Sequence, residues 1–426
     1  MTTRWLKRLG FKGLAASLLG AAALAGGIRP ATAGSSKPPI TFLAAIIESG
    51  PFKVTDGQNL AGIRFAVDQI NAKGGIDGHP VKLDVIDTEL NAAVTRRKTV
   101  DAVLQDHVSA IIGASGSDIL NVLVAVGQRY HVPVIAFAGE ADELTGSRFK
   151  PALFRVASNT TMHAAALVYA LKHDYPDVKK VFLLNEDYSF GHQSEAGFRK
   201  ALAKLDPGVQ IVGDVFHPRG VADFSPYLQQ IQASGADFVL TADWGADLVQ
   251  LLTQANSFGL KPRIGGTFLA DPDILKGVGN AAIGDIGADV YLLTIDMPEN
   301  KAFVAAWHAT HADTDLPWPT ASVAKSYIAT ELAALGITRA GSTDFKKVEA
   351  ALEGLHYASI AGPLTIRPCD HQVQIGQATG EVEPTTGTYY KFPFVGPALI
   401  APISAIAVPP AETGNPRCAA NRNGNG

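Results

Sequence analysis

Residues 40–47 read ITFLAAII, and residues 57–75 read GQNLAGIRFAVDQINAKGG. The first stretch is a short apolar run with the length of a buried strand. The second places Leu60, Ile63, Val67 and Ile70 on one face of a helix, and its glycine pair at 74–75 is typical of a helix C-terminus. A buried strand followed by an amphipathic helix is the first half of a βαβ unit, which predicts a parallel sheet covered by helices.

The same alternation extends along the chain in both halves. Strands are predicted at 81–86, 108–113 and 132–137, with helices at 92–106 and 118–130. After a further strand at 153–157 the order begins again, with helices that start near 160, 193, 224 and 246 and strands at 180–184, 209–215, 237–241 and 263–266. The repeated order predicts an α/β fold of two doubly wound, Rossmann-like lobes.

Composition narrows the class of protein. The 426 residues are 47% hydrophobic and 18% charged, which is too apolar for a disordered chain and too charged for a membrane bundle. A formal net charge of −4 offers no surplus of basic side chains to neutralise phosphates. We therefore expect a globular protein that does not bind nucleic acid.

Residues 1–33 have the pattern of a secretory signal peptide. Basic side chains at Arg4, Lys7, Arg8 and Lys12 precede an apolar stretch at 14–25, and Ala31-Thr32-Ala33 supplies small residues for cleavage. The apolar stretch is too short to span a bilayer well, so a retained anchor is the weaker alternative. The sequence predicts cleavage after Ala33 and a periplasmic location.

Two cysteines, Cys369 and Cys418, lie near the C-terminus. An oxidising compartment allows them to form a disulfide that would pin the end of the chain, and two unpaired thiols are the alternative. Residues 410–426 are otherwise expected to be an extended, partly disordered tail. The chain has no histidine pair at the spacing of zinc enzymes, so neither a metal site nor a cofactor is predicted.

Two α/β lobes leave a crevice between the carboxyl ends of their sheets, which is where such folds bind ligands. The strand-end loops therefore supply the candidate ligand-binding residues, which are Ser49, Phe52, Ser117, Ala138, Gly139, Glu140, Tyr188, Phe190, Asp243, Trp244 and Thr267.

These loops carry several kinds of chemistry. Ser117 precedes a helix, so it is either a helix cap or a ligand contact, or both. The carboxylates of Glu140 and Asp243 would suit an ammonium or amide group, and solvated loop acids are the plainer alternative. Aromatic side chains such as Trp244 would clamp a small amphipathic molecule or pack at a hinge. Residues 113–117 partly match a nucleophile elbow, but the last glycine is replaced by Ser117, which disfavours a serine hydrolase.

Several stretches together resemble one known family. They are DQINAKGGI at 68–76, Ile112-Gly113, Glu143-Leu144-Thr145, DYSFG at 187–191, Asp223-Phe224-Ser225 and RPCDHQ at 367–372. In this order they resemble the type I periplasmic solute-binding proteins, specifically the branched-chain amino-acid (Leu/Ile/Val) binding family of ABC transporters. The resemblance covers residues 40 to about 395.

The resemblance implies a monomer with two lobes joined by a three-crossover hinge, which closes around a solute and presents it to the permease and ATPase subunits of a transporter. It places lobe 1 at 38–157 and 292–370 and lobe 2 at 158–291 and 371–409. A periplasmic ligand-sensing protein that feeds a separate receptor is the alternative, with an exported serine hydrolase the more remote one.

The family's contact positions map onto the candidate residues with two departures. Ser117 and the backbone of Ala138 match the groups that meet the amino-acid carboxylate, and Trp244 with Tyr188 or Phe190 matches the aromatic contacts. The family's threonine falls on Glu140, and its ammonium-binding acid falls on Thr267. Either Glu140 or Asp243 has taken over ammonium binding, or the ligand is an amide, an amine or an aromatic acid.

Overall fold

The computed structural model describes residues 37–50 and 53–420, which leaves the predicted signal peptide and Phe52 outside the described residues. A parallel five-stranded sheet forms the core of the first lobe, and its strands in spatial order are β2 (Val81–Asp87), β1 (Ile40–Ile46), β3 (Ala110–Gly113), β4 (Val134–Ala136) and β5 (Leu153–Arg155). Every residue of β1 is buried, because helices cover both faces of the sheet. The helices of this lobe are α1 (Lys53–Ala72), α2 (Ala92–Gln105), α3 (Ser117–Tyr130), α10 (Ala321–Ala340) and α11 (Phe345–Leu352).

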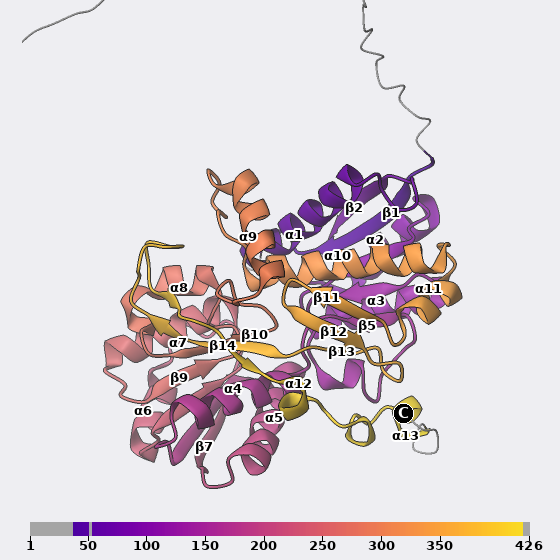
Figure 1. Ribbon diagram of the computed structural model, residues 1–426. Coiled ribbons are helices and arrows are strands. Elements are labelled where there is room, and N and C mark those ends of the chain that lie inside the picture. The colour runs from indigo at the N-terminus through magenta and orange to yellow at the C-terminus, as the bar shows by residue number, and fades with distance from the viewer. Residues whose placement is uncertain (1–36, 51–52, 421–426) are drawn as a thin grey trace, which may run out of the picture. The chain divides into compact units, whose positions relative to one another are not determined.

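The second lobe repeats this plan, as the sequence predicts, and its sheet is larger than that of the first lobe (Figure 1). Its parallel strands in spatial order are β10 (Ile286–Asp289), β9 (Arg263–Gly266), β8 (Phe238–Thr241), β6 (Lys180–Glu186) and β7 (Gln210–His217). An antiparallel edge follows β10 and consists of β14 (Gln377–Glu383), β15 (Phe394–Val395) and β16 (Leu399–Ala401). The helices are α4 (Thr160–Asp174), α5 (Ser189–Leu205), α6 (Ser225–Ser234), α7 (Gly245–Phe258) and α8 (Pro272–Val278).

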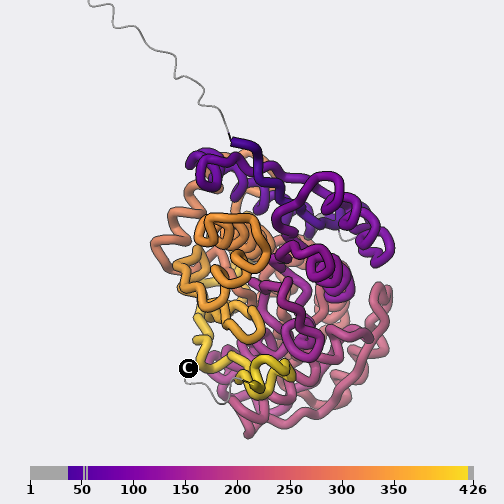
Figure 2. The backbone as a smooth tube through the Cα atoms, turned by 90° about the vertical axis from the view of Figure 1, so that its right-hand side faces the viewer, coloured from indigo at the N-terminus to yellow at the C-terminus, as the bar shows by residue number. Residues whose placement is uncertain are grey.

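The chain passes between the two sheets three times. The crossings lie between β5 and β6, between β10 and α10, and between β13 (Val373–Gln374) and β14. The small sheet of β11 (His356–Ser359), β12 (Gly362–Ile366) and β13 reaches the first sheet through a bridge between Arg155 and Gln372. Helix α9 (Pro298–His311) lies within the second crossing. In the view turned by 90°, the pink segments of the second lobe lie below the indigo and violet segments of the first (Figure 2).

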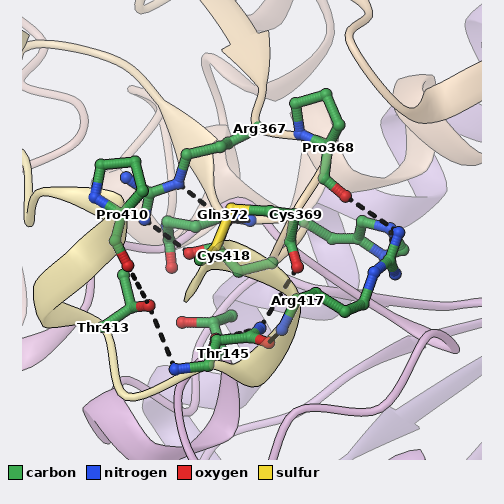
Figure 3. Close-up of a disulfide and its surroundings, with 12 residues drawn as sticks. Thr145, Arg367, Pro368, Cys369, Gln372, Pro410, Thr413, Arg417 and Cys418 are labelled. Atoms are coloured by element: carbon green, nitrogen blue, oxygen red, sulfur yellow. Dashed lines mark hydrogen bonds and ion pairs between the residues drawn. A yellow bond between two sulfur atoms is a disulfide. The ribbon is translucent and has the colours of Figure 1, made fainter. Parts of the chain in front are cut away.

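The end of the chain differs from the extended tail expected from the sequence. Between residues 410 and 420 the chain forms η3 (Pro410–Glu412) and α13 (Pro416–Ala420), after α12 (Ile403–Ile406). A disulfide joins Cys418 of α13 to Cys369, with Cα atoms 4.9 Å apart (Figure 3). The prediction of an extended conformation was wrong for residues 410–420, where short helices form and the buried Asn415 donates to the carbonyl oxygens of Thr145 and Cys369.

Within residues 37–50 and 53–420, no helix combines the length and the apolar character that a bilayer crossing requires.

Candidate functional site

One cavity lies where the carboxyl ends of the two sheets meet, and both lobes line it. It holds about 930 Å³ of empty space, part of which is open to solvent. The first lobe contributes the loops after β3 and β4 and the start of α10. The second contributes the loops after β6, β8 and β9 and the end of β10. Of the predicted residues, those that line the cavity are Ser117, Ala138, Gly139, Glu140, Tyr188, Phe190, Trp244 and Thr267. Ser49 is exposed and is not among the lining residues, and Asp243 is not among them either.

Three helices begin at the cavity without a side-chain cap. They are α3 after Gly116, α5 after Tyr188 and α7 after Trp244. The first N–H groups of a helix lack intrahelical partners and carry the positive end of its dipole. Their convergence on one cavity creates a region that favours a negatively charged group.

The two serines near the start of α3 have different partners. Ser115 Oγ donates to Asp56 Oδ1, and this carboxylate also accepts from the backbone N–H of Ile47 at 2.7 Å. Burial raises the pKa of Asp56 to about 6. Ser117 Oγ accepts from the backbone N–H of Ala141 at 3.1 Å, so its own proton remains available to a ligand. Ser117 is therefore the better placed of the two serines to bind a ligand.

The loop after β4 is fixed by a buried arginine. The Arg155 guanidinium donates to the carbonyl oxygens of Gly139 at 3.1 Å and Ala141 at 2.7 Å, and to Gln372 Oε1 at 2.7 Å. Arg155 is fully buried. The two bonds to carbonyl oxygens of the loop come from one rigid, planar group, and they hold the loop that carries Ala138 and Glu140 at the cavity.

Four buried charged side chains form one cluster at the cavity wall. Glu140 Oε2 lies 2.8 Å from His163 Nδ1, and Lys325 Nζ lies 2.9 Å from Asp289 Oδ2 and 3.7 Å from Glu140 Oε1. His163 Nε2 donates to the Ala288 carbonyl at 2.8 Å, so both ring nitrogens face acceptors and the imidazole is charged. The cluster contains two acids and two cations, which balance one another.

The pKa values of the cluster follow from this pairing. Burial alone would raise the pKa of Glu140, but the charge and hydrogen bond of His163, with the charge of Lys325, hold it below its ordinary value. Burial alone would lower the pKa values of His163 and Lys325, but the neighbouring carboxylates raise both. The prediction placed Glu140 at the cleft, and the structure shows that its charge there is already neutralised.

Asp243 turns away from the cavity, contrary to the expectation that its carboxylate faces the cleft. Its Oδ2 accepts from His217 Nε2 at 2.8 Å, and both side chains are fully buried. Burial lowers the pKa of His217, but the hydrogen bond and charge of Asp243 outweigh this and raise it to about 9. Asp243 follows β8 and His217 ends β7, so the pair stays within the second lobe.

Aromatic side chains form much of the rest of the wall. The ring centroid of Phe190 lies 5.8 Å from that of Tyr188 and 6.1 Å from that of Phe268. Trp244 Nε1 donates to Glu186 Oε2 and to the Tyr188 hydroxyl, both at 3.1 Å. Burial and the charge of Asp243 raise the pKa of Glu186 to about 8. The hydrogen bonds fix the indole and phenol rings as flat surfaces at the cavity.

Thr267 is a lining residue of the cavity, and its hydroxyl is buried. The residue is 2% exposed, and Oγ1 has no hydrogen-bond partner among the described residues. A buried hydroxyl without a partner costs free energy, which a ligand would recover by bonding to it.

Sequence reasoning missed several lining residues. Asp271 and Asp273 begin α8, where Gln58 donates to the Asp273 carboxylate, and burial raises the pKa of Asp271 to about 7. Lys325 reaches the cavity from α10. In the sequence, Lys325 stands out only as a lysine on an otherwise apolar face of a helix, with Ala324 and Ile328 as neighbours on that helix. Asp289 ends a buried strand, which is the position that identified the other candidates.

Comparison with known proteins agrees with this architecture. A family model described as periplasmic binding protein matches residues 39–386. A Leu/Ile/Val-binding protein homolog 4 of Brucella abortus is 25% identical over 388 residues, which cover 87% of this chain and 92% of the relative. An ABC transporter substrate-binding protein from Sphaerobacter thermophilus is 26% identical with a TM-score of 0.77, covering 85% of this chain and 98% of its own. A solute-binding protein of R. palustris, solved with 4-hydroxybenzoate, shares the fold at 22% identity and a TM-score of 0.77, covering 87% and 99%.

Proposed function

Because the chain belongs to the periplasmic binding protein family, we propose that it is the exported solute-binding component of an ABC uptake system. In this role it closes two lobes around one small solute and delivers the solute to a membrane permease and its ATPase. The observation that carries the proposal is one cavity lined by both lobes, with three uncapped helix starts and the unpartnered Thr267 hydroxyl at its wall.

Sheet membership supports the proposed lobes of 38–157 with 292–370 and 158–291 with 371–409, except at one boundary. Residues 372–374 bond to Arg155 and to β12 on the side of the first lobe, so the last crossing lies a few residues later than proposed. Strands β1 to β5 lie in the first sheet, and strands β6 to β10 with β14 lie in the second. Export by residues 1–33 and a periplasmic location belong to the same proposal, because the family acts in that compartment.

A binding role without catalysis is supported by the state of the serine that a hydrolase would use. The Ser115 hydroxyl donates to the Asp56 carboxylate at 2.5 Å, whereas a serine nucleophile needs a base such as histidine to accept its proton. We therefore propose that the solute leaves the site unchanged.

The class of solute is an amino acid, an amide or an aromatic acid. Neighbours that share the fold include a Brucella ovis protein named for leucine, isoleucine, valine, threonine and alanine, and R. palustris proteins solved with 4-hydroxybenzoate and with benzoate. These names describe those proteins, and the polar and aromatic wall described above is compatible with each class.

A ligand screen on the chain without residues 1–33 tests the proposal. A solute that binds only the folded protein raises its melting temperature. At a concentration of 100 times Kd, it adds about 2.7 kcal/mol to the free energy of unfolding. We expect at least one amino acid, amide or aromatic acid to produce this rise, and small-angle scattering to show a smaller radius of gyration with it bound. A panel in which no compound stabilises the protein, or stabilisation without compaction, would contradict the proposal.

A further inference from the structure

Resting on the proposed function, we propose that the solute is a monocarboxylate with a flat apolar body and without an α-ammonium group, such as an aromatic acid. The groups that the cavity leaves unpaired point to this chemical class. A binding protein for α-amino acids would need an acid in the cavity that is free to receive the ammonium group.

The cavity offers several hydrogen-bond donors to a carboxylate. The starts of α3, α5 and α7 present uncapped N–H groups at the cavity, and the Ser117 hydroxyl keeps its proton free. The Thr267 hydroxyl, 2% exposed, supplies a further donor that has no other partner among the described residues. A carboxylate accepts up to about four hydrogen bonds, so it matches this set.

An α-ammonium group, by contrast, would meet acids that are already neutralised. Glu140 is paired with His163, and Asp289 is paired with Lys325. All four side chains are at least 94% buried. An ammonium group could bind either carboxylate only by displacing a buried cation, which would leave that cation without a partner in a dry site.

Two further acids line the cavity at the start of α8. The Asp271 carboxylate accepts from the backbone N–H of Asp273 at 2.9 Å, and the Asp273 carboxylate accepts from Gln58. Neither forms an ion pair within the described part of the chain. They are the groups that a cationic ligand would use, so the experiment includes a variant at Asp273.

The body of the ligand is set by the aromatic wall. Phe137, Phe190, Trp244 and Phe268 line the cavity together with small apolar side chains. The hydrogen bonds from Trp244 Nε1 to Glu186 and Tyr188 hold the indole in place without using a ligand. Flat apolar surfaces of this kind favour a planar hydrocarbon body.

Calorimetry with matched ligand pairs tests the inference. 3-Phenylpropanoate and L-phenylalanine share one skeleton and differ in the α-ammonium group, as do 4-methylpentanoate and L-leucine. Benzoate extends the series to an aromatic acid, and 3-phenylpropanamide removes the carboxylate charge. We expect the carboxylates to bind at least tenfold more tightly than both the amino acids and the amide.

Tighter binding of L-phenylalanine or L-leucine than of its des-amino partner would overturn the inference and leave the proposed function intact. So would a wider screen in which an amine or an amide is the ligand. A protein that binds none of the screened classes would instead overturn the proposed function.

Three variants make the test independent of the wild-type affinity. Thr267→Glu places an acid without a cationic partner in the cavity, so the preference should move at least tenfold toward the amino acid of each pair. Thr267→Gln, which has the same size without the charge, should leave the preference within twofold. Asp273→Asn should leave the des-amino acids within threefold. An unchanged preference in Thr267→Glu, or a loss of binding in Asp273→Asn when its melting temperature is unchanged, would contradict the inference.

Discussion

Two buried carboxylate–histidine pairs follow strand ends in this protein, and they serve different regions. Glu140 and His163 join the first lobe to the second, because His163 lies on α4 and also donates to the Ala288 carbonyl of β10. Asp243 and His217 lie within the second lobe, behind the cavity wall. Both contacts measure 2.8 Å, and both pairs are buried. Similar local chemistry therefore bridges the lobes in one place and stiffens one lobe in the other.

The difference between the pairs lies in their neighbours. Lys325 joins the Glu140 pair and brings Asp289 with it, which makes a cluster balanced in charge at the cavity. The Asp243 pair has a further acid beside it, since Glu186 acts on it through its charge. The cluster around Glu140 therefore presents little net charge to a ligand. Around Asp243, the raised pKa values of His217 and Glu186 favour their protonated forms.

The largest expected effect comes from removing the cation that distinguishes the first region. Lys325→Met leaves Asp289 without its ionic partner and takes one from Glu140, so we expect the free energy of unfolding to fall by about 3–5 kcal/mol. Urea unfolding at neutral pH measures this. The double variant Lys325→Met, Asp289→Asn should recover part of the loss, because it removes a buried acid as well. A single variant within about 1 kcal/mol of wild type would show that the cluster is not coupled in this way.

The second region predicts a pH dependence. The pKa of His217 is raised to about 9 in the folded protein, against 6.5 ordinarily. The folded state therefore binds the proton more tightly, and the stability this supplies is present below pH 6.5 and is lost as the pH rises through 9. Glu186, with a pKa raised to about 8 mainly by burial, acts in the same direction between about pH 4.5 and 8.

Unfolding curves between pH 5 and 9.5 measure this dependence. We expect the wild type to lose stability across the range, and His217→Gln to show a shallower decline above pH 6.5. Wild-type stability that stays level or increases toward pH 9 would mean that His217 does not carry the proton in the folded state.

The fold followed from the sequence because each βα unit is encoded locally. The apolar runs and helical faces lie within about 30 residues of one another, and the order of elements then leaves few ways to wind the sheet. At the end of the chain, a disulfide between Cys369 and Cys418 was expected, but the short helices η3 and α13 were not. They carry no long periodic pattern, and Asn415 is held by carbonyl oxygens of Thr145 and Cys369, which are distant in the sequence.

The site was predicted in part, for a related reason. Ser117, Glu140 and Thr267 were predicted from their place after strand ends, and all three line the cavity. The reason is that the carboxyl ends of parallel strands meet at one crevice. A place after a strand end could not show that Asp243 turns toward His217, since the direction of a side chain depends on a partner 26 residues earlier. Lys325 was missed because α10 reaches the cavity only after the chain has returned from the second lobe.

Removing the acid of the first pair should alter ligand binding. Glu140→Gln removes the carboxylate that raises the pKa of His163, so the test is made at a pH low enough to keep His163 protonated. Under that condition the cluster has one positive charge in excess beside the cavity. If the ligand is a carboxylate, we expect its Kd to decrease by about three- to tenfold, while the melting temperature falls because His163 loses its ionic partner. Calorimetry and a thermal shift on the same preparation measure both. Weaker binding of the carboxylate would indicate that Glu140 contacts the ligand itself.

The smallest effect on binding is expected from the matched change in the second pair. Asp243→Asn keeps the shape of the side chain and an acceptor for His217, but it removes the charge of a group that does not line the cavity. We expect the ligand Kd to stay within about twofold, a difference of about 0.4 kcal/mol. Stability should fall by about 1–3 kcal/mol, because a charged hydrogen bond becomes a neutral one. Calorimetry beside urea unfolding separates the two quantities. A tenfold loss of affinity in a variant that keeps wild-type stability would place Asp243 at the ligand and erase the distinction between the two pairs.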